Sequence, residues 1–135
     1  MVPMDIAGLL RQALRHSGCA DSQIGHFDGH GTIEMRMRNL PDVNVAVVEG
    51  DVWIWAVVAE ATPQTFNYCA FDLMQFLLEG NAFSRTGQLH LCEVEGRLEL
   101  RLMANALALS DAEHLAQALD SFVQAVEALL EILRR

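Results

Sequence analysis

The segment Val52-Trp53-Ile54-Trp55-Ala56-Val57-Val58 constrains the fold of this chain more than any other part of it. Most of its residues are β-branched or aromatic, which favours a strand, and successive side chains of a strand point to opposite faces of a sheet. Because every position is apolar, both faces of the sheet must be covered at this strand. One of the two covers can be a partner.

Four further segments are expected to form strands around this one. In Thr32–Arg38, apolar and charged residues alternate, which is typical of a half-buried strand. Pro41-Asp42 ends that strand, and Glu49-Gly50-Asp51 joins the next strand to the apolar run as a hairpin. The other predicted strands are Val43–Val48, Gly87–Val94 and Arg97–Ala104. Consecutive strands are therefore expected to pair antiparallel.

Three helices complete the predicted elements. The first runs from about Met4 to Ser17 with Asp5 as its N-cap, and the second runs from Thr62, also a cap, to Glu79. The third covers about 24 residues and begins at Ser110-Asp111-Ala112-Glu113, which has the spacing of a capping box. The order helix, three strands, helix, two strands, helix predicts a single α+β domain over residues 1–135.

The composition indicates a surplus of apolar surface. Hydrophobic residues make up 52% of the 135 residues and charged residues only 20%, so a chain of this size has more apolar side chains than an ordinary domain. The predicted helix at 62–79 is apolar around most of its circumference and needs contacts on two sides. Since large apolar patches are rare on monomers, we expect an obligate oligomer.

The charge of the chain excludes several classes of partner. Eighteen acidic residues against nine basic ones give a net charge of −9, and all the basic residues are arginines scattered along the sequence. Nucleic acids and anionic membranes would be repelled. No apolar run approaches the ~18 residues of a membrane span, and the N-terminus lacks the features of a secretory signal. We therefore expect a cytosolic protein with reduced cysteines.

Metal and nucleophilic chemistry find little support in the sequence. Cys19, His26 and His30 come closest to a zinc site, but such sites carry four ligands, and the segment here is a glycine-rich loop. We interpret them as loop histidines and a packed cysteine. Cys69 lies on a predicted apolar helix, where burial makes a thiol unreactive.

The two tryptophans allow two interpretations. Trp53 and Trp55 stand two residues apart on a predicted strand and therefore project from the same face. Core packing is the interpretation that we favour, since aromatic side chains dominate protein cores. The alternative is that the pair anchors a partner.

Several stretches, distributed over nearly the whole chain, resemble the invasion protein B family of class IB type III secretion chaperones. They are Met4-Asp5-Ile6-Ala7 with Leu9 and Leu10, Ser17-Gly18-Cys19, Asp51-Val52-Trp53-Ile54-Trp55-Ala56, Glu79-Gly80-Asn81-Ala82-Phe83 leading to Gly87-Gln88-Leu89, and Leu109-Ser110-Asp111. The tryptophan run is the most specific of them. The fold that the resemblance implies, α-β-β-β-α-β-β-α with a twisted antiparallel sheet in a homodimer, is similar to the order derived above.

The resemblance implies no enzyme activity and no cofactor. It implies a bacterial cytoplasmic homodimer that binds the N-terminal segments of secreted effector proteins in an extended, non-globular state and keeps them competent for secretion. The residues expected at the dimer interface are Phe66, Ala70, Leu73, Phe76 and Leu77. Those expected in the effector-binding groove are Leu10, Leu14, Trp53 and Trp55.

Two other functions are weighed against this one. A regulatory dimer would bind a folded partner, either a component of the secretion system or a transcription regulator. A small metalloenzyme would require stoichiometric zinc at Cys19, His26 and His30. The identity and number of the effectors, and a direct contact with the secretion ATPase, are beyond what the sequence indicates.

Overall fold

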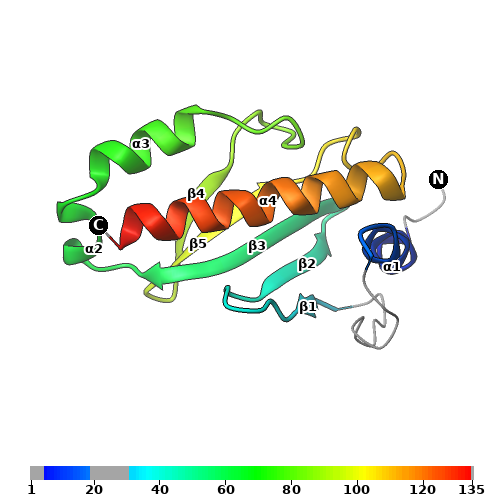
Figure 1. Cartoon of the computed structure of the whole chain (residues 1–135), viewed down its shortest axis with the longest axis horizontal. Helices are drawn as coiled ribbons and strands as arrows, with labels where there is room; N and C mark the ends of the chain where they lie inside the picture. The colour runs from blue at the N-terminus through cyan, green and yellow to red at the C-terminus, as the bar shows by residue number, and fades with distance from the viewer. Residues whose placement is uncertain (1–4, 19–30, 135) are drawn as a thin grey trace.

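The computed structural model describes residues 5–18 and 31–134 of the chain. It contains a five-stranded antiparallel sheet, and α4 crosses one face of this sheet with α1 beside it (Figure 1). The elements are α1 (Ile6–His16), β1 (Ile33–Met35), β2 (Val43–Val48), β3 (Asp51–Glu60), α2 (Pro63–Asn67), α3 (Ala70–Leu78), β4 (His90–Val94), β5 (Arg97–Met103) and α4 (Ala112–Leu133). The predicted α+β class is confirmed, and the predicted second helix is divided into two.

The apolar strand β3 lies at the centre of the sheet. The strand order is β1-β2-β3-β5-β4, so β3 pairs with β2 on one side and with β5 on the other. Glu49 and Gly50 have φ angles of 52° and 84° and form the two-residue turn of the predicted hairpin between β2 and β3. Positive φ at both positions is the geometry whose twist matches that of the flanking strands.

The edge strand β1 is shorter than the predicted strand at 32–38. Its pairing with β2 ends where Met35 lies opposite Val43. The chain that precedes Val43 is Pro41-Asp42, and proline has no amide hydrogen to donate to a neighbouring strand. The ladder therefore stops at Met35, although the alternation of apolar and charged residues continues beyond it.

The core lies between the sheet and the pair α1 and α4. Val52, Ile54 and Ala56 of β3 are no more than 1% exposed, and they belong to the same buried cluster as Phe122 of α4 and Leu10 of α1. The side of β3 that carries Val52, Ile54 and Ala56 is thus covered by the chain's own helices. Within the described ranges, no helix is both long and apolar enough to cross a membrane.

The predicted helix at 62–79 is interrupted at Tyr68 and Cys69. Its start is as predicted, with the Thr62 side chain accepting a hydrogen bond from the amide of Thr65. At the break, the Cys69 thiol donates a hydrogen bond to the carbonyl of Thr65 at 2.9 Å. The Cys69 amide donates instead to the carbonyl of Phe66, the residue after Thr65. The amide hydrogen bond here spans three residues instead of four, so the α-helical pattern is interrupted at this turn.

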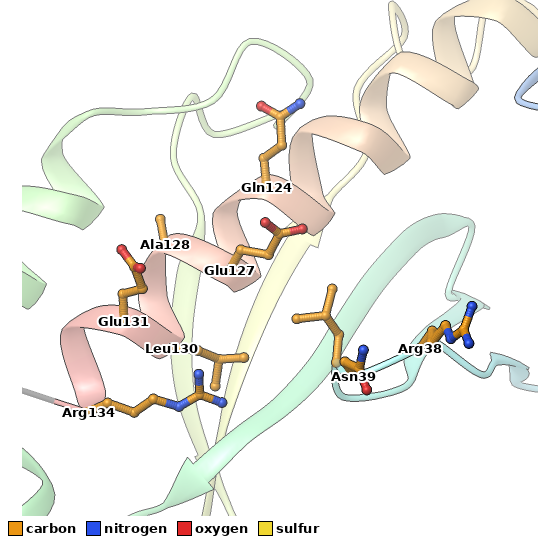
Figure 2. Close-up of a pocket in the computed structure, with 9 residues that line it drawn as sticks. Arg38, Asn39, Gln124, Glu127, Ala128, Leu130, Glu131 and Arg134 are labelled. Atoms are coloured by element: carbon orange, nitrogen blue, oxygen red, sulfur yellow. The ribbon is translucent and has the colours of Figure 1, made fainter.

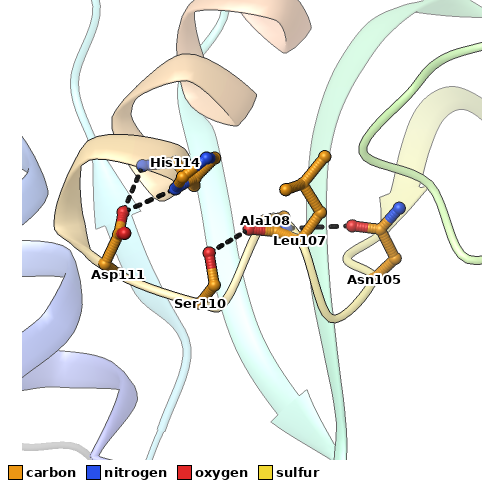
Figure 3. Close-up of polar contacts among 6 residues, drawn as sticks. All are labelled: Asn105, Leu107, Ala108, Ser110, Asp111 and His114. Atoms are coloured by element: carbon orange, nitrogen blue, oxygen red, sulfur yellow. Dashed lines mark hydrogen bonds and ion pairs between the residues drawn. The ribbon is translucent and has the colours of Figure 1, made fainter.

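The cap of α4 differs from the capping box predicted with Ser110. Asp111 is the N-cap, and its Oδ1 accepts a hydrogen bond from the amide of His114 at 2.8 Å (Figure 3). The Ser110 hydroxyl instead donates to the carbonyl of Leu107 at 2.7 Å. The sequence spacing could not separate these arrangements, because serine and aspartate are equally good caps and stand next to each other.

The cap makes part of the stability dependent on pH. The His114 amide donates to the carboxylate of Asp111 and lowers the pKa of that group in the folded protein. A lowered folded-state pKa contributes stability that is complete above the unfolded-state pKa, about 4, and is lost as the pH falls through the folded value. We expect Asp111→Asn to keep the cap but to show a smaller fall in Tm than the wild type as the pH is lowered below about 4. Asp111→Ala should lower Tm already at pH 7, and thermal scans followed by circular dichroism measure both effects.

Candidate partner-binding surfaces

The sheet face opposite α1 and α4 carries both tryptophans of the chain. Trp53 and Trp55 alternate along β3 with the buried residues that face the helices, and both are half-buried. The strand register places Trp55 opposite Arg101 of β5, and Arg101 opposite His90 of β4. We call the group formed by Trp53, Trp55, Glu99, Arg101 and His90 the tryptophan face.

Aromatic rings and a guanidinium group are stacked across this face. The guanidinium carbon of Arg101 lies 5.3 Å from the ring centre of Trp55 and 5.9 Å from that of Trp53. The rings of Trp53 and His90 meet edge to face at 6.2 Å. Both distances from Arg101 are within the range of a favourable cation–π interaction. The arrangement holds two large apolar rings around one positive charge.

Glu99 fixes the position of Arg101. Its Oε1 accepts two hydrogen bonds from Arg101, one from Nε at 3.0 Å and one from Nη2 at 2.7 Å. The Glu99 side chain is only 7% exposed, whereas the Arg101 side chain is 27% exposed. A buried carboxylate without a partner is costly, so Glu99 keeps the guanidinium in place. Sequence analysis missed this pair because the alternation of charged residues with leucines in β5 predicts only an outward polar side.

A second uncovered surface lies on the outer side of α3 and on the turn before it. Tyr68, Phe71, Met74 and Leu78 are exposed by 87%, 71%, 62% and 67%, respectively. Phe71, Met74 and Leu78 are three, then four, residues apart, which places them on one side of the helix. We call these four residues the α3 surface.

The expected dimer residues lie mostly behind the α3 surface. Leu73 is buried within the chain, and Phe66 and Phe76 are half-buried against its core. Leu77 is half-buried and Ala70 is exposed. A helix that is apolar nearly all round predicts two contacts, but its sequence does not tell which side faces its own chain. In the structure, the inner side fixes the helix to the core and the outer side is left open.

The four expected groove residues are not brought together. Leu10 has no exposed surface and Leu14 packs partly buried against the core on α1, on the helix-bearing side of the sheet. Trp53 and Trp55 alternate with the core residues of β3 and therefore point to the opposite side. Leu10 is a core residue in this conformation, so a ligand cannot touch it there.

A cleft of about 590 Å³ lies between the second half of α4 and the connection from β1 to β2 (Figure 2). Its lining consists of Arg38, Asn39, Leu40, Gln124, Glu127, Ala128, Leu130, Glu131 and Arg134. Carboxylates and guanidinium groups share this lining, so the cleft favours neither an anion nor a cation.

The residues weighed for metal and nucleophilic chemistry have no role in these surfaces. Cys19, His26 and His30 lie outside the described residues. Among the residues that the structure does describe, no three histidine, cysteine or acidic side chains are grouped to hold a metal ion. Cys69 is buried, and its thiol is engaged with the Thr65 carbonyl.

The fold has a counterpart among solved structures. A chain of the heterodimeric ExoU–SpcU complex, from the type III secretion system of Pseudomonas aeruginosa, aligns with a TM-score of 0.58 at 17% sequence identity. The alignment covers 89% of this chain and 93% of that chain. The α+β architecture described above is therefore shared with a chain of this complex.

Sequence comparison assigns the family. The surface presentation of antigens proteins SpaK of Salmonella typhimurium and Salmonella typhi are each 37% identical to this chain over 135 residues, the full length of both proteins. The model of the invasion protein B family matches residues 18–95. The chain belongs to the invasion protein B family, which comprises non-enzymatic proteins of the type III secretion chaperone kind. The resemblance inferred from the sequence is confirmed.

The pair of Glu99 and Arg101 is expected to stabilise the fold. Glu99→Gln and Arg101→Gln each leave a partly buried group without its charged partner, and each should lower the free energy of unfolding by about 1–3 kcal/mol. The double variant should lose less than the sum, with a coupling energy of about 0.5–3 kcal/mol. Urea unfolding followed by circular dichroism measures all four proteins. Strictly additive losses would mean that the two side chains do not stabilise each other.

Proposed function

We propose that this protein is a cytoplasmic type III secretion chaperone that binds the N-terminal segments of one or more effector proteins in an extended, non-globular state. Its family and fold support a role in secretion. The structural neighbour comes from a heterodimeric complex of two proteins of such a system, which supports a protein ligand. The observation that carries the proposal is the tryptophan face, an aromatic surface that α1 and α4 leave uncovered.

An extended ligand suits this surface physically. A sheet face presents alternate side chains in rows, and an extended segment presents its own alternate side chains at the same spacing. Burial of apolar area contributes roughly 25 cal/mol per Å², and ordering a non-globular segment opposes it. A long segment can therefore be held firmly without a deep pocket. Sequence-tolerant contacts of this kind also allow several different effectors to bind.

We further propose that two copies associate through the α3 surface. The apolar side chains of Phe71, Met74 and Leu78 face outward, and exposed patches of this kind mark contact sites between proteins. The expected interface residues Leu73 and Phe76 support this contact from behind, because they pack α3 against the core. Phe66 packs against the same core from α2, and Leu77 is half-buried on α3. Ala70, which is exposed and small, lets another chain approach the helix closely.

A charge on the α3 surface tests the homodimer. Met74→Glu places a carboxylate at the centre of the proposed contact, where it would be buried without a partner. We expect this variant to remain folded and to sediment as a monomer, because the Met74 side chain is 62% exposed in the single chain. Gln117→Glu, an exposed position on α4, makes the same charge change away from the contact and should leave the dimer intact. A Met74→Glu dimer as stable as the wild type would remove α3 from the interface.

Protection from proteolysis tests the binding of effectors. The protein is co-expressed with N-terminal fragments of secreted effector proteins from the same organism, and each complex is isolated by size exclusion. We expect limited proteolysis to leave a bound segment intact while the rest is digested, and we expect that segment to gain no helical signal of its own in circular dichroism. Co-elution with a folded, protease-resistant partner would instead favour the regulatory dimer. Absence of any complex would contradict the chaperone function.

A further inference from the structure

Arg101 has hydrogen-bonding capacity that the rest of the described chain does not use. A guanidinium group carries five N–H donors. Glu99 accepts one from Nε and one from Nη2, and no other hydrogen bond of Arg101 is found among residues 5–18 and 31–134. Three donors therefore remain on a side chain that is 27% exposed. They are free to meet an acceptor from another molecule.

These donors are held in a fixed place. The buried Glu99 anchors the guanidinium from one side, and the rings of Trp53 and Trp55 lie 5.9 Å and 5.3 Å away. An arginine fixed in this way loses little side-chain entropy on binding a ligand, in contrast to a freely moving surface arginine. Arginine also matches a carboxylate with two parallel hydrogen bonds. The tryptophan face thus combines a preorganised carboxylate receptor with two apolar rings.

We propose that Arg101 is a specificity-determining residue of the tryptophan face, which selects segments carrying an acidic side chain two positions away from a large apolar one. This inference rests on the proposed binding of extended segments. In an extended chain, residues i and i+2 project to the same side. The acidic side chain meets Arg101, and the apolar one packs on a tryptophan ring.

The chemistry of this face favours a client segment over a second copy of the chain. Phe71, Met74 and Leu78 of the α3 surface have no acceptor for the free Arg101 donors, and the Tyr68 hydroxyl supplies one neutral acceptor where three donors are unused. Covering Arg101 with that surface would leave most of these donors buried and unpaired. With a net charge of −9, the protein as a whole repels acidic segments, so a preference for them can come only from a local contact.

Selection from a random library tests the proposal. Twelve-residue peptides displayed on phage are selected on the full-length wild type and on two variants, Arg101→Gln and Arg97→Gln. Arg97 lies on the same strand and the same side as Arg101, and it is exposed, so this control removes an equal charge. The wild type and Arg97→Gln should enrich peptides with Asp or Glu at position i and an aromatic or large aliphatic residue at i+2 or i−2. Arg101→Gln should retain the apolar preference and lose the acidic one.

Titration of one selected peptide adds a quantitative test. Trp53 and Trp55 are the only tryptophans in the chain, so their fluorescence reports binding at this face alone. Losing a hydrogen-bonded charge pair should raise Kd by about tenfold or more, both in Arg101→Gln and when the peptide's Glu is changed to Gln. The two changes together should weaken binding no further than either one. Because the peptide change leaves the protein untouched, this arm holds even if Arg101→Gln folds poorly.

Several results would overturn the inference. Apolar peptides enriched by the wild type without any acidic preference would leave the proposed function standing and remove Arg101 as a determinant. An equal loss in Arg97→Gln would attribute the preference to overall charge. Dissociation of the dimer by Arg101→Gln would place this face in the contact between copies. Failure of the wild type to enrich any peptide would reject the proposed extended-segment binding itself.

Discussion

Residues 52–58 of β3 are apolar on both sides of the sheet, and the need to cover both sides determines the rest of the structure. The strand lies at the centre of the sheet, and α1 and α4 cover only the side that carries Val52, Ile54 and Ala56. On the other side, Trp53 and Trp55 stay half-buried among polar neighbours. The 135 residues form one layer of helices over one sheet. Cover for the second side of the sheet must therefore come from side chains of the sheet itself or from another molecule.

The Glu99–Arg101 pair is such a device. By laying a guanidinium group over two tryptophan rings, the sheet reduces the exposure of its apolar residues without a further helix. The arrangement places a charged group over the rings and leaves three donors of Arg101 unused. A purely apolar cover would have hidden the rings permanently, and a bare face would have invited aggregation.

The hydrophobic periodicity of the sequence predicted most of the fold, but it did not predict how the candidate binding residues are arranged. Alternation, glycine turns and caps predicted every strand, because these depend on contacts between neighbours in sequence. The central place of β3 depends on the order of the strands, which only the structure shows. The break at Cys69 is a shift of its amide hydrogen bond from Thr65 to Phe66, which no hydrophobic pattern contains. Likewise, Leu10 and Trp53 are both apolar, and only the three-dimensional packing shows that they lie on opposite sides of the sheet.

The two uncovered surfaces differ in a way that separates their roles. The α3 surface is apolar apart from one phenol hydroxyl, and an apolar surface can pack against the same surface of a second copy across a twofold axis. The tryptophan face carries the Glu99–Arg101 ion pair and three unused Arg101 donors, and an identical copy of it would offer more donors and a carboxylate that is already paired and buried. Self-association is therefore better satisfied at α3 than at the tryptophan face. With the proposed function, a contact between copies through α3 leaves the side chains of the tryptophan face available to a client segment.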